Sequence, residues 1–188
     1  MINKIIAEIR KALANEMYII ALNSALTLPD ICAKAEYPHE KNNNTRYKNW
    51  VKHYIETREF GVYWESCFKG IDAELIYDLR CSLLHQGNPN VKKKIANYFE
   101  LITTPPGDRH IVPYTIELEY QIVDGEKRLV AKRVGVNVAV FCNLLCAATE
   151  EYYNFNKEKF GFFNYNLVNM DFHTAQTFKI SDAYRNVK

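Results

Sequence analysis

Apolar residues recur every three or four positions through the start of the chain, and this spacing constrains the fold more than any other feature. The residues are Ile2, Ile5, Ile6, Ile9, Leu13, Met17 and Ile20. In an α-helix they fall on one face, which has to be buried against other parts of the protein. The pattern therefore predicts an amphipathic helix over residues 2–25, packed into a bundle of helices.

Residues that begin or end helices divide the next part of the chain. Pro29 suits the first turn of a short helix over residues 30–35, which a Tyr-Pro pair would end. Thr45 can cap a further helix over residues 46–60. The pattern up to residue 60 therefore predicts three helices joined by short connections.

A fourth helix is bounded on both sides. Asp72 is a good N-cap, Gly87 suits the left-handed residue that follows a helix, and Pro89 prevents the helix from continuing. Four apolar residues within this helix fall within roughly a quarter-turn and predict a core stripe. The stripe consists of Leu75, Ile76, Leu79 and Leu83.

The helical spacing fails after this helix. Residues 95–104 and 114–136 favour strands, with Asp124-Gly125 as the turn of a hairpin, and residues 137–160 return to a long helix. We expect one mainly α domain, an antiparallel helical bundle with a β-hairpin inserted before its last long helix. The bundle would comprise residues 1–90 and 136–160, the β insertion residues 96–135, and an unassigned tail residues 161–188.

Composition limits the class of protein. The 188 residues carry a net charge of +2, which excludes a strongly basic nucleic-acid coat but allows a local positive site. Five cysteines without a C-x-x-C pair predict reduced thiols in a cytoplasmic protein. The longest apolar stretch, residues 136–148, contains two Asn and is too short to span a bilayer. We therefore expect a soluble protein without a signal peptide or membrane contact.

The side of the 72–87 helix opposite its core stripe carries the candidate site. It holds Arg80, Leu84, Tyr77, Cys81 and His85, in that angular order, over an arc of about 140°. So apolar a face predicts a second contact, with another helix or with a second subunit. Arginine suits phosphate oxygens and histidine exchanges protons near neutral pH. Such a pair, acting without a metal, fits RNA cleavage by the neighbouring 2′-hydroxyl.

Structural interpretations of the same residues stay open. His85 can bond a carbonyl at the helix end, while Arg80 can pair with Asp78 or with a neighbouring helix. The basic and aromatic residues at 46–53 can line a nucleic-acid surface, but their spacing favours a core stripe. No histidines or cysteines stand at metal-ligand spacing, so we expect neither a metal nor another cofactor.

A run of three lysines follows the helix. Lys92, Lys93 and Lys94 can guide an RNA backbone toward the Arg–His pair, and we include them as candidate substrate-binding residues. The same run is also typical of a solvated loop.

The segment "LRCSLLHQGNP" resembles the HEPN superfamily of small helical-bundle domains, many of which are ribonucleases. The family motif is an arginine, four to six residues and then a histidine on a late helix, and "RCSLLH" matches its shortest form. The resemblance covers residues 1–90 and the helix after residue 136. The segment "ALTLPDICAKAEYP" resembles a fixed feature of one bacterial subgroup.

The resemblance implies a homodimeric, metal-independent endoribonuclease, active in stress response or defence and restrained by an antitoxin or other partner. Arg80 would hold the scissile phosphate and His85 would act as general acid or base. Beside this resemblance, we include Tyr77, Cys81 and Ser82 as candidate supporting residues. The residue after the motif arginine is usually polar, whereas here it is Cys81, which cannot supply an amide's hydrogen bonds. An inactive module that binds RNA, nucleotide or protein is therefore the alternative, and a purely structural scaffold is the third.

Overall fold

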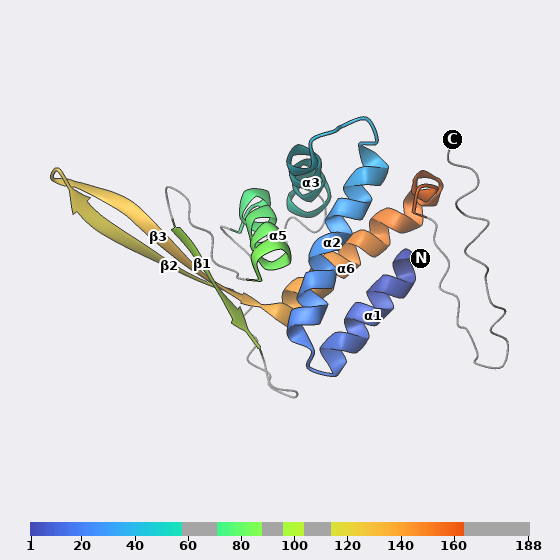
Figure 1. The fold of residues 1–188 in the computed structure, drawn as a ribbon, viewed down its shortest axis with the longest axis horizontal. Coiled ribbons are helices and arrows are strands. Elements are labelled where there is room, and N and C mark those ends of the chain that lie inside the picture. Colours follow the sequence, from blue (N-terminus) through green and yellow to red (C-terminus); the bar gives the residue numbers. More distant parts are fainter. Residues whose placement is uncertain (58–70, 88–95, 104–113, 164–188) are drawn as a thin grey trace, which may run out of the picture.

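The computed structural model describes residues 1–57, 71–87, 96–103 and 114–163. It is mainly helical, as expected, and also contains a small three-stranded sheet (Figure 1). The helices are α1 (Ile2–Ala14), α2 (Tyr18–Glu36), α3 (Asn43–Val51), the π-helix η1 (Lys52–Glu56), α5 (Ala73–Gln86), α6 (Val138–Phe155) and the 3₁₀-helix η2 (Lys157–Phe160). The strands are β1 (Ala96–Ile102), β2 (Tyr114–Val123) and β3 (Glu126–Asn137).

Helix α2 lies at the centre of the bundle and contacts α1, α3, α5 and α6. Its near-continuous apolar sequence explains this position, because a helix that is hydrophobic on most sides is stable only when neighbours surround it. Leu22, Leu26 and Leu28 are fully buried, and Trp50 and Phe141 meet the same core from α3 and α6. Among the described residues, no helix combines the length and apolarity that crossing a membrane requires.

The prediction of one helix over residues 2–25 is wrong, because the chain turns between α1 and α2. Glu16 adopts a left-handed conformation (φ 58°), and the Met17 amide donates to the Ala12 carbonyl at 2.9 Å. The Glu16 amide donates to the Leu13 carbonyl at 3.0 Å, which completes a Schellman end. The turn uses glutamate where glycine is usual, so no glycine signalled it. As a consequence, Met17 and Ile20 are exposed instead of extending the buried stripe.

The expectation that Pro29 begins a short helix is also wrong, since Pro29 lies inside α2 and is buried. Proline lacks the amide that would bond the carbonyl four residues back, so its cost inside a helix is usually decisive. Here burial of α2 among four neighbouring helices outweighs that cost. The uninterrupted helix carries Asp30 to a position beside α5.

The third helix begins earlier than predicted. Asn42, and not Thr45, is the cap, and its side-chain oxygen accepts from the amides of Asn44 (3.0 Å) and Thr45 (3.2 Å). The α-helix gives way to the π-helix η1 after Val51 instead of continuing to residue 60. Residues 58–60 lie outside the described part of the chain.

The sheet has the order β1-β3-β2, with β1 parallel and β2 antiparallel to β3. Asp124 and Gly125 form the predicted hairpin turn, and both have positive φ (54° and 79°), as a two-residue turn requires. Gly135 allows close packing on β3, because a Cβ there would lie 2.2 Å from the Thr115 hydroxyl oxygen. The sequence predicted a strand at residues 95–104, and the structure shows that this strand, β1, pairs with β3 to make a three-stranded sheet.

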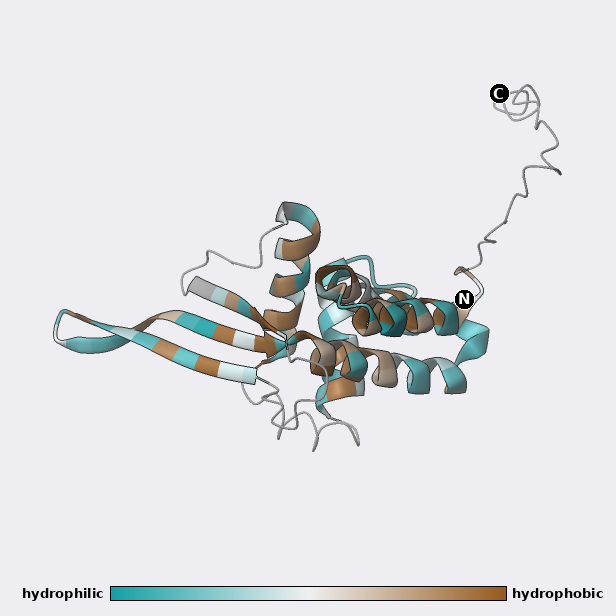
Figure 2. Ribbon diagram, turned by 90° about the horizontal axis from the view of Figure 1, so that it is seen from below, coloured by the Kyte–Doolittle hydropathy of each residue, from teal (hydrophilic) through white to brown (hydrophobic). Residues whose placement is uncertain are grey.

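The base of the sheet joins the core, whereas the hairpin end projects away from the helices (Figure 2). Phe99, Val134 and Val136 are buried in the main core. Leu118 and Ile122 farther along β2 are exposed, and hydrophilic and hydrophobic bands alternate there. Asn137 then caps α6 by accepting from the Val140 amide at 3.2 Å, so the sheet leads directly into the last long helix.

Glu36 fastens the end of α2 to the end of the chain's described part. Its carboxylate accepts from the Tyr152 hydroxyl at 2.8 Å and from the Lys159 ammonium at 2.6 Å. Although burial opposes it, hydrogen bonds from Lys159, Tyr152 and Tyr54 hold the pKa of Glu36 below its usual value. A depressed carboxyl pKa contributes stability above the unfolded pKa of about 4.3, and this is lost as the pH falls through the folded pKa.

We therefore expect Glu36→Gln to lower the free energy of unfolding by about 1 kcal/mol at pH 7 and by much less at pH 3. Urea unfolding at the two pH values measures the difference. Glu8→Gln, at an exposed position of α1, is the control and should have no such effect. An equal loss at both pH values would contradict the role of the charge.

Candidate functional site

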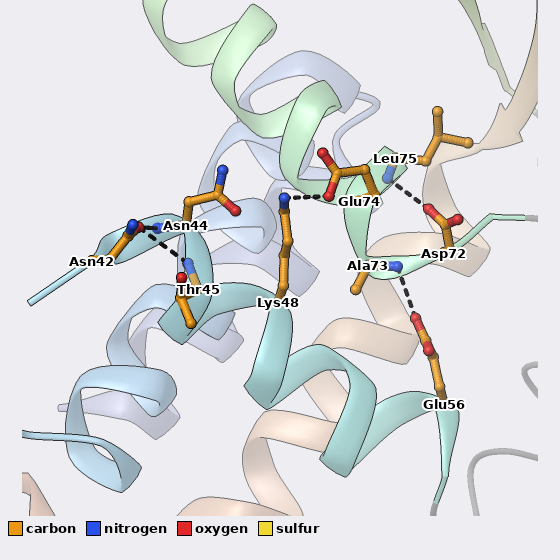
Figure 3. A network of polar contacts seen from close by, with 9 residues as sticks. All are labelled: Asn42, Asn44, Thr45, Lys48, Glu56, Asp72, Ala73, Glu74 and Leu75. Atoms are coloured by element: carbon orange, nitrogen blue, oxygen red, sulfur yellow. Dashed lines mark hydrogen bonds and ion pairs between the residues drawn. The ribbon is translucent and has the colours of Figure 1, made fainter. Parts of the chain in front are cut away.

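The start of α5 is held by three contacts shown in Figure 3. Asp72 caps the helix as predicted, accepting from the Leu75 amide at 2.8 Å. The Glu56 carboxylate accepts from the Ala73 amide at 2.7 Å, which ties α5 to η1. Lys48 of α3 forms an ion pair with Glu74. These contacts satisfy helix-end amides and fix α5 against α3 and η1.

The two predicted faces of α5 differ in burial. All four residues of the core stripe are buried, and so are Ser82 and Asp78. On the other side Arg80, Tyr77 and Cys81 are half-buried, whereas Leu84 and His85 are exposed. The described residues therefore cover this face only in part.

Arg80 is held by groups from three helices. Its guanidinium forms an ion pair with Asp30 of α2, and the two side chains are 15% and 20% exposed. It also lies 5.6 Å from the ring centroid of Tyr47 on α3 and 5.8 Å from that of Tyr77 on α5. Rings and carboxylate together fix an arginine that would otherwise sample many rotamers.

The ion pair leaves hydrogen-bonding capacity unused. Within the described part of the chain, the Asp30 Oδ1 and Arg80 Nε atoms are buried without a hydrogen-bond partner. Burial raises the pKa of Asp30 against the opposing pull of Arg80. Burial lowers the pKa of Arg80, but Asp30, Tyr47 and Cys81 together raise it above its usual value, so the guanidinium stays charged. An orphaned donor on a charged guanidinium is what a phosphate oxygen can satisfy.

The other candidate residues of α5 lie at different distances from Arg80. The Cys81 sulfur lies 3.9 Å from a guanidinium nitrogen of Arg80, and burial together with a hydrogen bond to Cys81 raises the pKa of Tyr77. Ser82 is buried on the opposite side and faces away from this group. His85 lies in the last turn, before Gly87 ends α5 in the left-handed conformation predicted for it (φ 63°). The structure thus places Tyr77 and Cys81 at Arg80, and His85 farther along the same helix.

Several groups at the site escaped the sequence analysis. Asp30 and Tyr47 contact Arg80 from positions 50 and 33 residues away in the chain, and no local pattern links them to it. The spacing around Lys48 favours a core stripe over a nucleic-acid surface, and α3 does bury Tyr47, Trp50 and Val51. The Lys48 cation nevertheless reaches α5.

Lys92, Lys93 and Lys94 lie outside the described residues, so their part in the site stays a prediction. The four described cysteines are free thiols, three of them buried. Across residues 1–57, 71–87, 96–103 and 114–163, no three His, Cys, Asp or Glu side chains gather as metal ligands would.

Comparison with known proteins finds no protein-family model, curated protein or solved structure that matches the chain.

Proposed function

We propose that the protein is a HEPN-like, metal-independent endoribonuclease that acts as a homodimer. The observation that carries the proposal is the arrangement of α5. A half-buried arginine with an unused donor is held against two tyrosine rings, and an exposed histidine follows on the same open face. Fixed positive charge next to a proton carrier is the minimum that metal-free RNA cleavage needs.

In the proposed reaction the 2′-oxygen of a ribose attacks the adjacent phosphorus while the bond to the 5′-oxygen of the next nucleotide breaks. The products are a 2′,3′-cyclic phosphate and a 5′-hydroxyl, and no water is consumed in this step. Arg80 neutralises the developing charge on the phosphate oxygens, which replace Asp30 as its partner. His85 transfers a proton at either the attacking or the leaving oxygen, and solvent exchanges the proton at the other oxygen.

A second subunit would complete the site. Leu84 is exposed between Arg80 and His85, so an apolar contact at this point lies within the candidate site. A two-fold axis along this face would bring two Arg–His pairs into one cleft. We therefore assign dimerisation to α5, in a cytoplasmic protein that acts in stress response or defence.

The test is cleavage of a single-stranded RNA in the presence of EDTA. We expect cleavage to persist, to leave cyclic phosphate ends, and to stop when the 2′-hydroxyl at the cleaved position is replaced by 2′-O-methyl. Light scattering should report a dimer at the concentrations where cleavage occurs. Loss of activity on metal removal, or products with 5′-phosphates, would contradict the mechanism.

Two observations favour a second candidate, an RNA- or nucleotide-binding module without cleavage. Arg80 already has a carboxylate partner in Asp30, and Cys81 occupies the position after the arginine that is usually polar. Such a module would retain phosphate binding at Arg80 and lack the histidine chemistry. In the same assay it would bind RNA, and an intact substrate would remain after long incubation.

A further inference from the structure

We propose that Lys48 and Tyr77 form a nucleotide subsite next to Arg80, in which the ring stacks on a base and the lysine contacts a second phosphate. The inference rests on the proposed function only for the identity of the ligand as single-stranded RNA. The groups themselves lie outside the Arg–His pair, and Lys48 comes from a different helix.

Tyr77 is flanked by two cations. The Lys48 ammonium lies 5.4 Å from its ring centroid and the Arg80 guanidinium carbon lies 5.8 Å from it. The ring is held edge-on against buried Tyr47, with centroids 5.3 Å apart and planes at 63°. A half-exposed ring with two cations near it combines a stacking surface with phosphate contacts, which is how proteins bind single-stranded nucleic acids.

Both cations are matched by carboxylates that a phosphate can replace. Lys48 pairs with Glu74 and Arg80 pairs with Asp30. The side chain of Glu74 is 54% exposed, whereas that of Lys48 is only 17% exposed. The carboxylate is thus the solvent-side member of this pair, and its displacement would open the cation to a ligand. The two ion pairs therefore mark two phosphate positions near the same ring.

In this proposal Arg80, Tyr77 and Lys48 contact the same RNA strand. Arg80 holds the scissile phosphate in the proposed reaction, so Lys48 contacts a phosphate next to it and Tyr77 stacks on the base between them. Stacking is tolerant of sequence, because every base has a π-face. The subsite thus selects unpaired RNA over duplex, in which the bases are stacked on each other.

The test is binding of a fluorescent 2′-O-methyl RNA oligonucleotide, which cannot be cleaved, measured by anisotropy at several salt concentrations. We expect Lys48→Gln to weaken binding several-fold and to reduce the slope of log K against log salt by about 0.7, the value for one phosphate contact on a single strand. Tyr77→Leu should weaken binding about tenfold, whereas Tyr77→Phe, which keeps the ring, should stay within about twofold.

The matched control is Lys52→Gln, an exposed lysine one helical turn beyond Lys48. If Lys48→Gln lowers the thermal midpoint of unfolding, Lys48→Arg is measured in its place. This variant keeps the cation and should bind RNA like the unchanged protein. Equal effects of Lys48→Gln and Lys52→Gln, or an unchanged affinity of Tyr77→Leu, would overturn the subsite. If natural RNA is cleaved and both changes are silent, the proposed ribonuclease stands and the subsite falls. If binding depends on both residues and no RNA is cleaved, the subsite stands and the ribonuclease falls.

Discussion

His85→Ala should lower the rate of RNA cleavage by about 10²- to 10⁴-fold, the range that a positioned proton carrier contributes. Because the His85 side chain is exposed, its removal should leave the thermal midpoint of unfolding nearly unchanged. The measurement is the single-turnover rate on a defined oligonucleotide, together with a melting curve of each variant. Loss of activity without loss of stability separates chemistry from folding.

The control for this experiment is His39→Ala, since His39 is also exposed and lies away from α5, just after α2. It should cleave at the rate of the unchanged protein. Arg80→Lys adds a second check, because it keeps the positive charge but loses the fork that binds two phosphate oxygens. Full activity of His85→Ala would remove the histidine from the mechanism and leave the binding module as the better description.

Asp30→Ala should lower the free energy of unfolding by about 2 kcal/mol. The ion pair with Arg80 is mostly shielded from solvent, and removing one partner leaves a guanidinium desolvated without its counter-ion. The expected loss is below the 3–5 kcal/mol typical of a fully buried pair, because both side chains keep some exposure. Urea unfolding of Asp30→Ala, Arg80→Met and the double variant measures the coupling between them. The double variant should be more stable than the sum of the single losses predicts.

The exposed pair of Arg10 and Glu150 provides the comparison. Its nitrogen and oxygen lie 2.8 Å apart, but the side chains are 48% and 38% exposed. Glu150→Ala should therefore cost at most about 0.5 kcal/mol. If the two carboxylates contributed equally, burial would not be the reason that the Asp30 pair stabilises the fold.

Local signals in the sequence predicted some elements well. Asp72 and Gly87 bound α5, and Asp124-Gly125 turns the hairpin, because caps and two-residue turns depend on the conformations of a few neighbouring residues. The same logic failed at Glu16, where a residue without a preference for the left-handed conformation ends α1. It failed again at Pro29, whose local cost is outweighed by tertiary burial of α2.

The candidate site also has a part that the sequence predicted and a part that only the tertiary structure shows. The spacing within α5 was enough to place Arg80 and His85 on a face away from the core stripe, since the helix period alone decides which residues share a side. Asp30, Tyr47 and Lys48 reach that face only because α2 and α3 pack against α5. Contacts between residues far apart in the chain depend on how whole helices pack, and that packing is set by the sum of many buried apolar contacts. The sequence by itself therefore determined the helix and its two faces, whereas the tertiary structure decided which charges and rings surround the arginine.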